Sequence, residues 1–230
     1  MIKINEYTKI AVNSLSKKLD DNHPEIRAKA AESLGRIGSE TAIPGLLKAL
    51  EDSDGFVRIK AAEALGNIGS ETAIAGLLKA LEDSYFEVCG YAAEALGKIG
   101  SETAIAGLLK ALEDSHWNVR IKAAEALGKI GSEIAIPGLL KALEDSDEYV
   151  RMYAAEALGK IGSEAAIAEL LKALEDSNKD VRRNAAEALG EIGLEEAIPA
   201  LINALSDEED SVRFSATDAI GKIGSRYALT

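Results

Sequence analysis

The sequence has little of what stabilises small secreted domains or anchors a protein in a membrane. It has one cysteine among 230 residues, so no disulfide can form within the chain. No apolar run approaches the roughly 20 residues of a membrane-spanning helix. The first residues, MIKINEYTKI, lack the pattern of a signal peptide. These absences predict a cytoplasmic protein that has no membrane as partner, since a reducing cytosol is the default for a chain without disulfides.

Positive charge is also in short supply. Lys and Arg number 26 against 39 Asp and Glu, which gives a net charge of −13. Nucleic acids and anionic membranes are bound through clustered Lys and Arg side chains. We therefore expect no nucleic acid among the partners.

Internal repetition, in contrast, runs along almost the whole chain. A block of the form A-I-x-G-L-L-K-A-L-E-D-S recurs every 31 residues without insertion, and looser copies extend the pattern in both directions. The predicted repeats are 11–41, 42–72, 73–103, 104–134, 135–165, 166–196 and 197–227. Residues 1–10 form a leader or N-terminal cap, and residues 228–230 form a short tail. Because one repeat cannot bury its apolar side alone, we expect a single domain of stacked repeats.

Each repeat has the pattern of two helices, as the second repeat shows. Its first half places apolar residues at the i, i+3, i+4, i+7 spacing of a helix face, at Ile43, Leu46, Leu47 and Leu50. Asp52 or Ser53 can then cap a second helix. That helix has its own apolar face, at Val57, Ala61, Ala64, Leu65 and Ile68, and Gly69 is a plausible end. Small residues at Ala61, Ala62 and Gly66 predict close approach of neighbouring helices.

The pattern resembles the HEAT-like repeats of the phycobilisome-lyase type over the whole stretch 11–227. The D-x5-R spacing, as in Asp52 to Arg58 and Asp145 to Arg151, and the AAEALGxIG tail carry the resemblance. It implies an all-α fold, a right-handed α-solenoid (α-α superhelix) of seven 31-residue αα-hairpin HEAT-like repeats. The first helices would lie outside and the second helices on the concave face. It also implies a ladder of Asp and Arg side chains between neighbouring hairpins.

The third repeat departs from this ladder, because Cys89 stands where the other repeats have Arg. We expect Asp83 to lack its usual partner within the repeat, so that the ladder is broken there. A reactive thiol is one interpretation of Cys89. We favour a small apolar residue in a locally altered surface.

Variation between repeats clusters at a few positions. When each repeat is numbered from 1 to 31, positions 13, 14, 15, 18 and 19 vary most. They lie at the start of the second helix and along one of its sides. Positions 15, 18, 19 and 22 share the i, i+3, i+4, i+7 spacing of one helix face, away from the apolar face. We expect this face to point into the concave surface.

Most aromatic residues of the chain fall at these variable positions. They are Phe56, Tyr85, Phe86, Tyr91, Trp117, Tyr149, Tyr153 and Phe214. Aromatic side chains are favoured anchors of protein interfaces. We predict that these eight residues bind a protein or peptide partner. Unconstrained drift is the competing interpretation, but drift at exposed sites should yield mostly Lys, Glu, Asn and Ser.

Position 22 is acidic in every repeat: Glu32, Glu63, Glu94, Glu125, Glu156, Glu187 and Asp218. One interpretation is an acidic row that suits a basic partner. We favour ordinary helix surface chemistry, with i, i+4 pairs such as Glu94–Lys98, Glu125–Lys129 and Glu156–Lys160.

No set of residues for catalysis is apparent. The sequence has no Gly-rich phosphate loop, zinc-ligand spacing or Ser-His-Asp set. Its two histidines, His23 and His116, lie three repeats apart, too far to share a metal. We therefore expect no catalytic residue, cofactor or metal.

The leading hypothesis is a non-enzymatic scaffold that binds a protein or peptide through an aromatic-rich concave face. The alternative implied by the resemblance is a bilin lyase-type subunit that acts on phycobiliprotein chromophores, and only then would a bilin be bound. An engineered repeat binder is a third possibility.

The last repeat predicts self-association. Ile220 and Ile223 keep the apolar pattern on the side that would receive another hairpin. Exposed apolar patches often mark association sites. We expect part of this side to be exposed and consider a homodimer through the C-terminal repeat; a monomer is the equal alternative.

Overall fold

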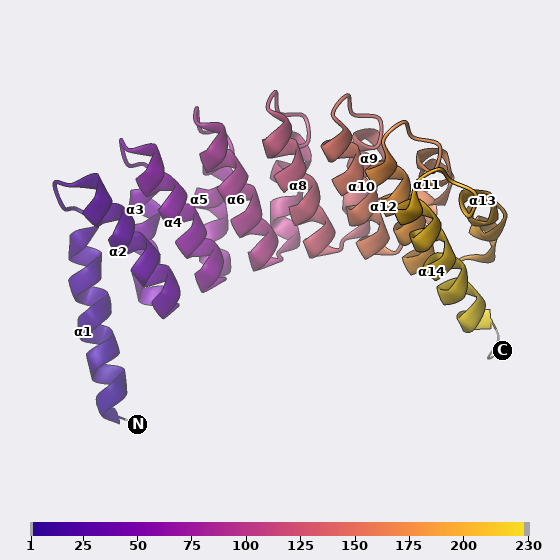
Figure 1. The fold of residues 1–230 in the computed structure, drawn as a ribbon. Coiled ribbons are helices and arrows are strands. Elements are labelled where there is room, and N and C mark those ends of the chain that lie inside the picture. Colours follow the sequence, from indigo (N-terminus) through magenta and orange to yellow (C-terminus); the bar gives the residue numbers. More distant parts are fainter. Residues whose placement is uncertain (1, 228–230) are drawn as a thin grey trace. The chain divides into compact units, whose positions relative to one another are not determined.

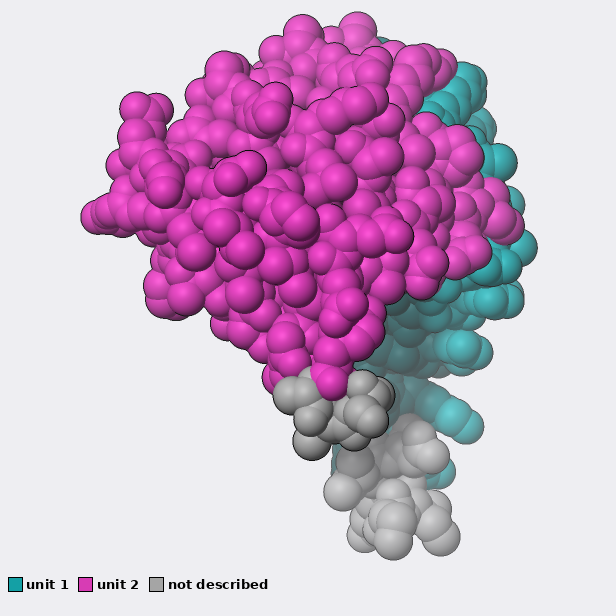
Figure 2. All heavy atoms as spheres, turned by 90° about the vertical axis from the view of Figure 1, so that its right-hand side faces the viewer, with its two compact units in different colours: residues 1–111 teal, residues 112–230 magenta. Residues whose placement is uncertain are grey.

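The computed structural model describes residues 2–227, with side chains from Glu6 onward, and the described residues contain helices and no strand. The chain divides into two compact units, residues 1–111 and 112–230 (Figure 2). Each unit is a stack of αα-hairpins, so the predicted all-α repeat fold is confirmed. The prediction of a single domain over residues 11–227 stays a prediction.

The described residues of the first unit form seven α-helices, and its second helices α2, α4 and α6 lie side by side in Figure 1. Helix α1 is continuous from the leader into the first repeat. The helices are α1 (Ile2–Lys18), α2 (Pro24–Ile37), α3 (Ile43–Ala49), α4 (Gly55–Ile68), α5 (Ile74–Ala80), α6 (Phe86–Ile99) and α7 (Ile105–Ala111).

The second unit continues the same alternation of a short and a long helix. Helices α10, α12 and α14 lie side by side, as the second helices of the first unit do. The helices are α8 (Trp117–Ile130), α9 (Ile136–Ala142), α10 (Glu148–Ile161), α11 (Ile167–Ala173), α12 (Lys179–Ile192), α13 (Ile198–Ala204) and α14 (Asp210–Tyr227). Three-residue 3-10 turns, such as Glu40–Ala42, precede the short helices α3, α5, α7, α9, α11 and α13.

The ends of the second helices follow local chemistry. Gly69 ends α4 with φ of 74°, a left-handed conformation that a side chain disfavours, and its N–H donates to the Leu65 carbonyl. The predicted N-cap was wrong by one or two residues. Asp54 caps α4, accepting from the N–H groups of Phe56 and Val57 at 2.9 and 3.2 Å. Asp52 instead accepts from the N–H of Asp54 at 2.9 Å, which shapes the turn before the helix.

Small residues bring the second helices into contact, as predicted. A Cβ atom on Gly66 would lie 2.8 Å from Cα of Ala95, and one on Gly159 would lie 2.8 Å from Cα of Ala188. Between first helices, the glycine at Gly76 instead faces the side chain of Leu47. The second helices therefore pack backbone to backbone, while leucine side chains space the first helices.

The face predicted for positions 15, 18, 19 and 22 is not uniformly exposed. At position 18, Ile59 and Ile121 are buried, because close packing of the second helices covers that side. The prediction that position 18 belongs to an open face that points into the concave surface was therefore wrong for these residues. Residues at positions 14 and 15, such as Trp117 and Phe56 respectively, are exposed.

The last repeat shows part of the expected apolar surface. Ile202 and Leu205 are exposed, and Ile220 is half-buried. Ile223 is fully buried within its own unit, so its predicted exposure was wrong. Ile223 lies in helix α14, which runs on to Tyr227. The homodimer stays a prediction, and the predicted tail at residues 228–230 lies outside the described residues.

Candidate functional site

Exposed aromatic rings meet at the start of second helices in the second unit. Trp117 begins α8, and its ring stacks on His116 with centroids 5.8 Å apart. The Tyr149 ring on α10 lies 6.3 Å from Trp117. Trp117 is 43% exposed and Tyr149 is 51% exposed. Two large rings from neighbouring repeats thus form one exposed platform, which we call the Trp117 platform (His116, Trp117 and Tyr149).

His116 has a structural part in this platform. Its Nδ1 accepts a hydrogen bond from the N–H of Asn118 at 3.2 Å, so the imidazole caps α8 while it stacks on Trp117. His23 occupies the matching position before α2 and lies 3.3 Å from a carboxylate oxygen of Asp21. Within the described residues, no group of three or more His, Cys, Asp or Glu side chains could hold a metal ion.

The first unit has its own aromatic pair at the same helix level. The rings of Tyr85 and Phe86 stack with centroids 6.3 Å apart, and both are exposed. Tyr85 occupies the N-cap position of α6 but makes no capping hydrogen bond with its side chain in the described structure. Asp54 and Asp147 make that bond in their own repeats. A lost cap costs about 0.5–2 kcal/mol, so the third repeat has an aromatic ring where helix stability favours Asp.

Phe56 and Tyr85 border an open hollow of about 610 Å³ between the starts of α4 and α6. Nζ of Lys60 lies 5.5 Å from the centroid of the Phe56 ring. The same ammonium pairs with Glu63 at 2.8 Å, and this hydrogen bond raises the pKa of Lys60. A cation of the protein itself therefore covers part of the Phe56 ring.

Tyr91, Tyr153 and Phe214 make no ring-to-ring contact among the residues that the structure describes. Tyr91 and Phe214 are exposed, while Tyr153 is half-buried. The structure therefore pairs Trp117 with Tyr149 and Tyr85 with Phe86, each within one unit. It does not test whether any of the eight residues binds a partner.

The acidic row at position 22 is largely paired with lysines on its own helices. Glu94 pairs with Lys98 at 3.0 Å and Glu156 with Lys160 at 2.5 Å, as predicted. Glu125 pairs with Lys122 at 2.8 Å, so its predicted pair with Lys129 was wrong. Both partners are reachable on a helix, because side chains three and four residues apart are neighbours.

The predicted ladder of Asp and Arg side chains between neighbouring hairpins is present. Nε and Nη2 of Arg58 donate to the two carboxylate oxygens of Asp83 in the next repeat, at 2.8 and 2.9 Å. Asp83 has no arginine partner within its own repeat, as predicted, but the prediction that the ladder is broken at Asp83 was wrong. Within its own repeat, Nη1 of Arg58 donates to the main-chain carbonyls of Asp52 and Ser53, at 2.8 and 3.4 Å. Cys89 is buried, and its Sγ lies 3.1 Å from the Asp83 carbonyl oxygen, in the place of the Arg58 contact with the Asp52 carbonyl.

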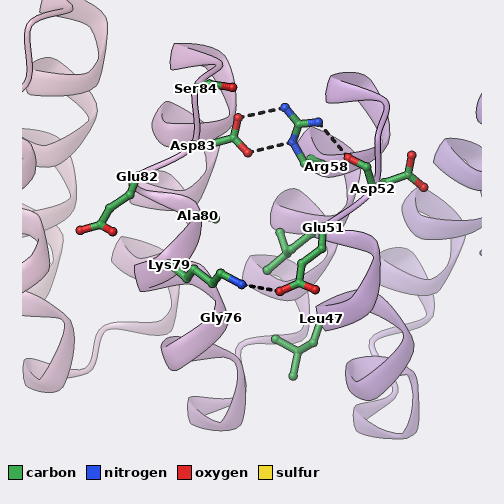
Figure 3. Close-up of a pocket in the computed structure, with 11 residues that line it drawn as sticks. Leu47, Glu51, Asp52, Arg58, Gly76, Lys79, Ala80, Glu82, Asp83 and Ser84 are labelled. Atoms are coloured by element: carbon green, nitrogen blue, oxygen red, sulfur yellow. Dashed lines mark hydrogen bonds and ion pairs between the residues drawn. The ribbon is translucent and has the colours of Figure 1, made fainter.

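This region is a crevice of about 460 Å³ between the second and third repeats, and Figure 3 shows residues that line it. Arg58 reaches Asp83, and Lys79 reaches Glu51 at 2.5 Å across the same crevice. The principal charged groups of the crevice thus form ion pairs with one another. The crevice joins repeats and offers little unpaired charge to a ligand.

No helix in the described part of the chain combines the length and apolar character that crossing a membrane requires.

No curated protein matches the sequence. Among solved structures, a chain of the complex of CpcE and CpcF of phycocyanin lyase from Nostoc sp. has 27% identity. The match covers 93% of this chain and 94% of that one, with a TM-score of 0.61.

Two further structures share the fold. An engineered protein has 29% identity over 94% of this chain and 68% of its own, with a TM-score of 0.58. A chain of the complex of Kap95p with RanGDP has 15% identity and a TM-score of 0.68. That match covers 92% of this chain and 36% of the other, and it shows the fold alone.

The sequence itself matches HEAT repeats over residues 12–89, 74–145, 108–186 and 167–230. These stretches overlap and together include all seven predicted repeats. They agree with the helical hairpins and the Arg–Asp ladder described above. The chain belongs to the HEAT-repeat family.

Proposed function

We propose that this protein is a non-enzymatic scaffold that binds a protein or peptide through the exposed aromatic residues of its second helices. The observation that carries the proposal is the Trp117 platform, in which two exposed rings from neighbouring repeats lie 6.3 Å apart. Water is an unfavourable environment for such rings, and Trp and Tyr are the residues most enriched at interface hot spots. The stacking core does not need them, because its leucines and alanines are buried elsewhere.

Similarity to complexes supports a protein partner. The CpcE–CpcF complex and the Kap95p–RanGDP complex are assemblies of proteins, although the second likeness extends to the fold alone. Stacked helical repeats offer extended surfaces for such contacts. The aromatic residues give this particular surface its anchors.

The test uses peptides selected on the protein from a random displayed library. Trp117→Ala should weaken the selected peptide by about 2 kcal/mol or more, about thirtyfold, because a hot-spot ring is removed. Tyr7→Ala is the matched control, since Tyr7 is an exposed aromatic residue on α1, outside the second helices. Melting temperature should hardly change in either variant. Equal losses of affinity in both variants, or a large loss of melting temperature with intact binding, would contradict the proposal.

A second candidate is a subunit of a phycocyanin lyase-type enzyme, favoured by the 27% identity that covers 93% of this chain. In that case a bilin would be the bound molecule. Incubation with a free bilin should then give a coloured protein with a shifted absorbance band. A scaffold should stay colourless under the same conditions while retaining its selected peptide.

A further inference from the structure

The sixth repeat breaks the charge pattern of position 22. In the other repeats, the acidic side chain at this position has a lysine partner on its own helix at 2.5–3.0 Å. Glu187 on α12 has no Lys or Arg partner among the described residues. Its one hydrogen bond is accepted by Oε1 from the Ser215 hydroxyl at 2.9 Å. Glu187 is also exposed, so its second oxygen is open to a ligand.

The sequence of the sixth repeat explains this difference. Asn184 takes the place of the lysine that lies three residues before the acid in the second and fourth repeats. Glu191 takes the place of the lysine that lies four residues after it in the third, fourth and fifth repeats. Like charges four residues apart destabilise a helix by about 0.2–0.5 kcal/mol. The repeat thus accepts a small cost that concentrates negative charge around Glu187.

Glu187 lines a hollow of about 450 Å³ on the second helices α10, α12 and α14. Two lysines also line it, but both are engaged. Lys160 pairs with Glu156 at 2.5 Å, and Lys222 pairs with Glu191 at 2.6 Å and Asp218 at 3.0 Å. Four carboxylates against two ammonium groups leave the hollow negative, and Glu187 is the carboxylate without a cation.

Two further side chains add acceptors and an apolar face. Asn184 lines the hollow and is only 6% exposed; its Nδ2 donates to the Asp180 carbonyl at 2.8 Å. Oδ1 of Asn184 accepts no hydrogen bond from any residue that the structure describes. Phe214 on α14 also lines the hollow and is 76% exposed, so its ring is open to contact. An amide oxygen that lines a hollow and has no protein donor can accept a hydrogen bond from a ligand.

We propose that this hollow receives an arginine side chain of the bound protein or peptide. A guanidinium carries the positive charge that Glu187 lacks and several planar N–H donors, which suit one carboxylate and one amide oxygen together. Its flat face can also stack on the Phe214 ring. The inference rests on the proposed function, because it assigns a chemical feature to the partner of the second helices.

The probes are fluorescently labelled tetra-arginine and tetra-lysine peptides, and their binding is measured by fluorescence anisotropy. The salt concentration is about 0.15 M, because salt screens the long-range attraction between the basic peptides and a protein of net charge −13. Tetra-arginine should bind more tightly than tetra-lysine. Glu187→Gln should weaken tetra-arginine by about fivefold, the upper range for an exposed ion pair. Asn184→Lys should weaken it similarly, because it supplies Glu187 with the internal partner found in other repeats.

Glu125→Gln is the matched control, since it removes the same charge at the same repeat position, where Lys122 already neutralises it. It should change the affinity by no more than about twofold. Equal losses in Glu187→Gln and Glu125→Gln, or equal affinities for the two peptides, would overturn the proposal. Unchanged circular dichroism in each variant checks the fold.

The two proposals fail separately. If Glu187→Gln leaves tetra-arginine binding unchanged while Trp117→Ala weakens the library-selected peptide, the arginine site is wrong and the aromatic surface stands. If Glu187→Gln weakens tetra-arginine but Trp117→Ala leaves the selected peptide unaffected, the aromatic anchors are wrong and the hollow stands as an arginine site.

Discussion

Two rows of ion pairs join successive repeats within each unit, and they differ in burial. The first row pairs Arg with Asp, and its side chains are 10–15% exposed: Arg27–Asp52, Arg58–Asp83, Arg120–Asp145, Arg151–Asp176 and Arg182–Asp207. The second row pairs Lys with an acid, and its side chains are 63–75% exposed: Lys48–Asp20, Lys79–Glu51, Lys110–Glu82 and Lys141–Glu113. Both rows are equally regular in the sequence.

The regular recurrence of an ion pair in the sequence therefore does not show how much that pair contributes to the stability of the fold. Each arginine of the first row forms a two-pronged contact with a carboxylate and also donates to a main-chain carbonyl, as Arg151 does with Asp176 and Asp145. Removing one partner would leave a half-buried charge alone. The lysines of the second row are point charges in water, where an ion pair contributes little.

The largest expected effect comes from acid, which acts on several pairs of the first row at once. Hydrogen bonds from Arg27 lower the pKa of Asp52, and those from Arg182 lower the pKa of Asp207. Because the folded pKa lies below the unfolded value of about 3.9, the stability from these pairs is complete above that pH. It is lost as the pH falls through the folded pKa. Urea unfolding at pH 7, 4 and 3 should show this loss.

Salt separates the two rows in that experiment. Hydrogen bonds from lysines also lower the pKa of Glu51, Glu82 and Glu113 in the exposed row. At about 1 M salt the Debye length is only about 3 Å, so the exposed row should contribute least there. Most of the loss between pH 4 and 3 should persist. Its disappearance in salt would show that the buried row is not the cause.

Breaking one buried pair should have the next largest effect. Arg151→Ala leaves Asp176 without its guanidinium and should lower the free energy of unfolding by about 3 kcal/mol. The matched control is Lys141→Ala, which removes a cation from the exposed row. Chemical denaturation measures both. Equal losses would mean that burial does not distinguish the rows.

Arg151→Lys separates the effect of charge from that of hydrogen-bond geometry, because it keeps the positive charge and removes the planar guanidinium group. An ammonium group cannot donate to both oxygens of Asp176 and to the Asp145 carbonyl in the same geometry. We expect a loss of about 1–2 kcal/mol in the free energy of unfolding, between those of the alanine variant and the wild type. A value equal to wild type would show that charge alone stabilises the pair.

The smallest effect is expected in the exposed row. Lys141→Gln and Glu113→Gln, alone and together, should give a coupling energy of no more than about 0.5 kcal/mol in a double-mutant cycle. The coupling should vanish at high salt. A salt-independent coupling energy above about 1 kcal/mol would mean that the exposed pairs stabilise the fold in the same way as the buried pairs.

Much of the site could be located from the sequence, because the rings that interrupt the repetition are exposed at the starts of second helices. Trp117 and Phe86 were predicted on that basis, and both are exposed. His116 was missed as part of the platform, although its place next to Trp117 at an N-cap position was a usable signal. The hollow at Glu187 was also missed. Its signal was the absence of lysine at residues 184 and 191.

The order of residues along the chain was enough to predict the period of 31 residues, the two helices of each repeat and the small residues where helices meet. These features depend on local hydrogen bonds and on apolar spacing within one repeat. The contact of Arg58 with Asp83 of the next repeat, and the burial of Ile59 and Ile223, could be seen only in the folded structure. A periodic sequence presents the same Asp in every copy, so it cannot say which copy a side chain reaches. That choice follows from the distance and angle between stacked hairpins, which exist only once the repeats have packed.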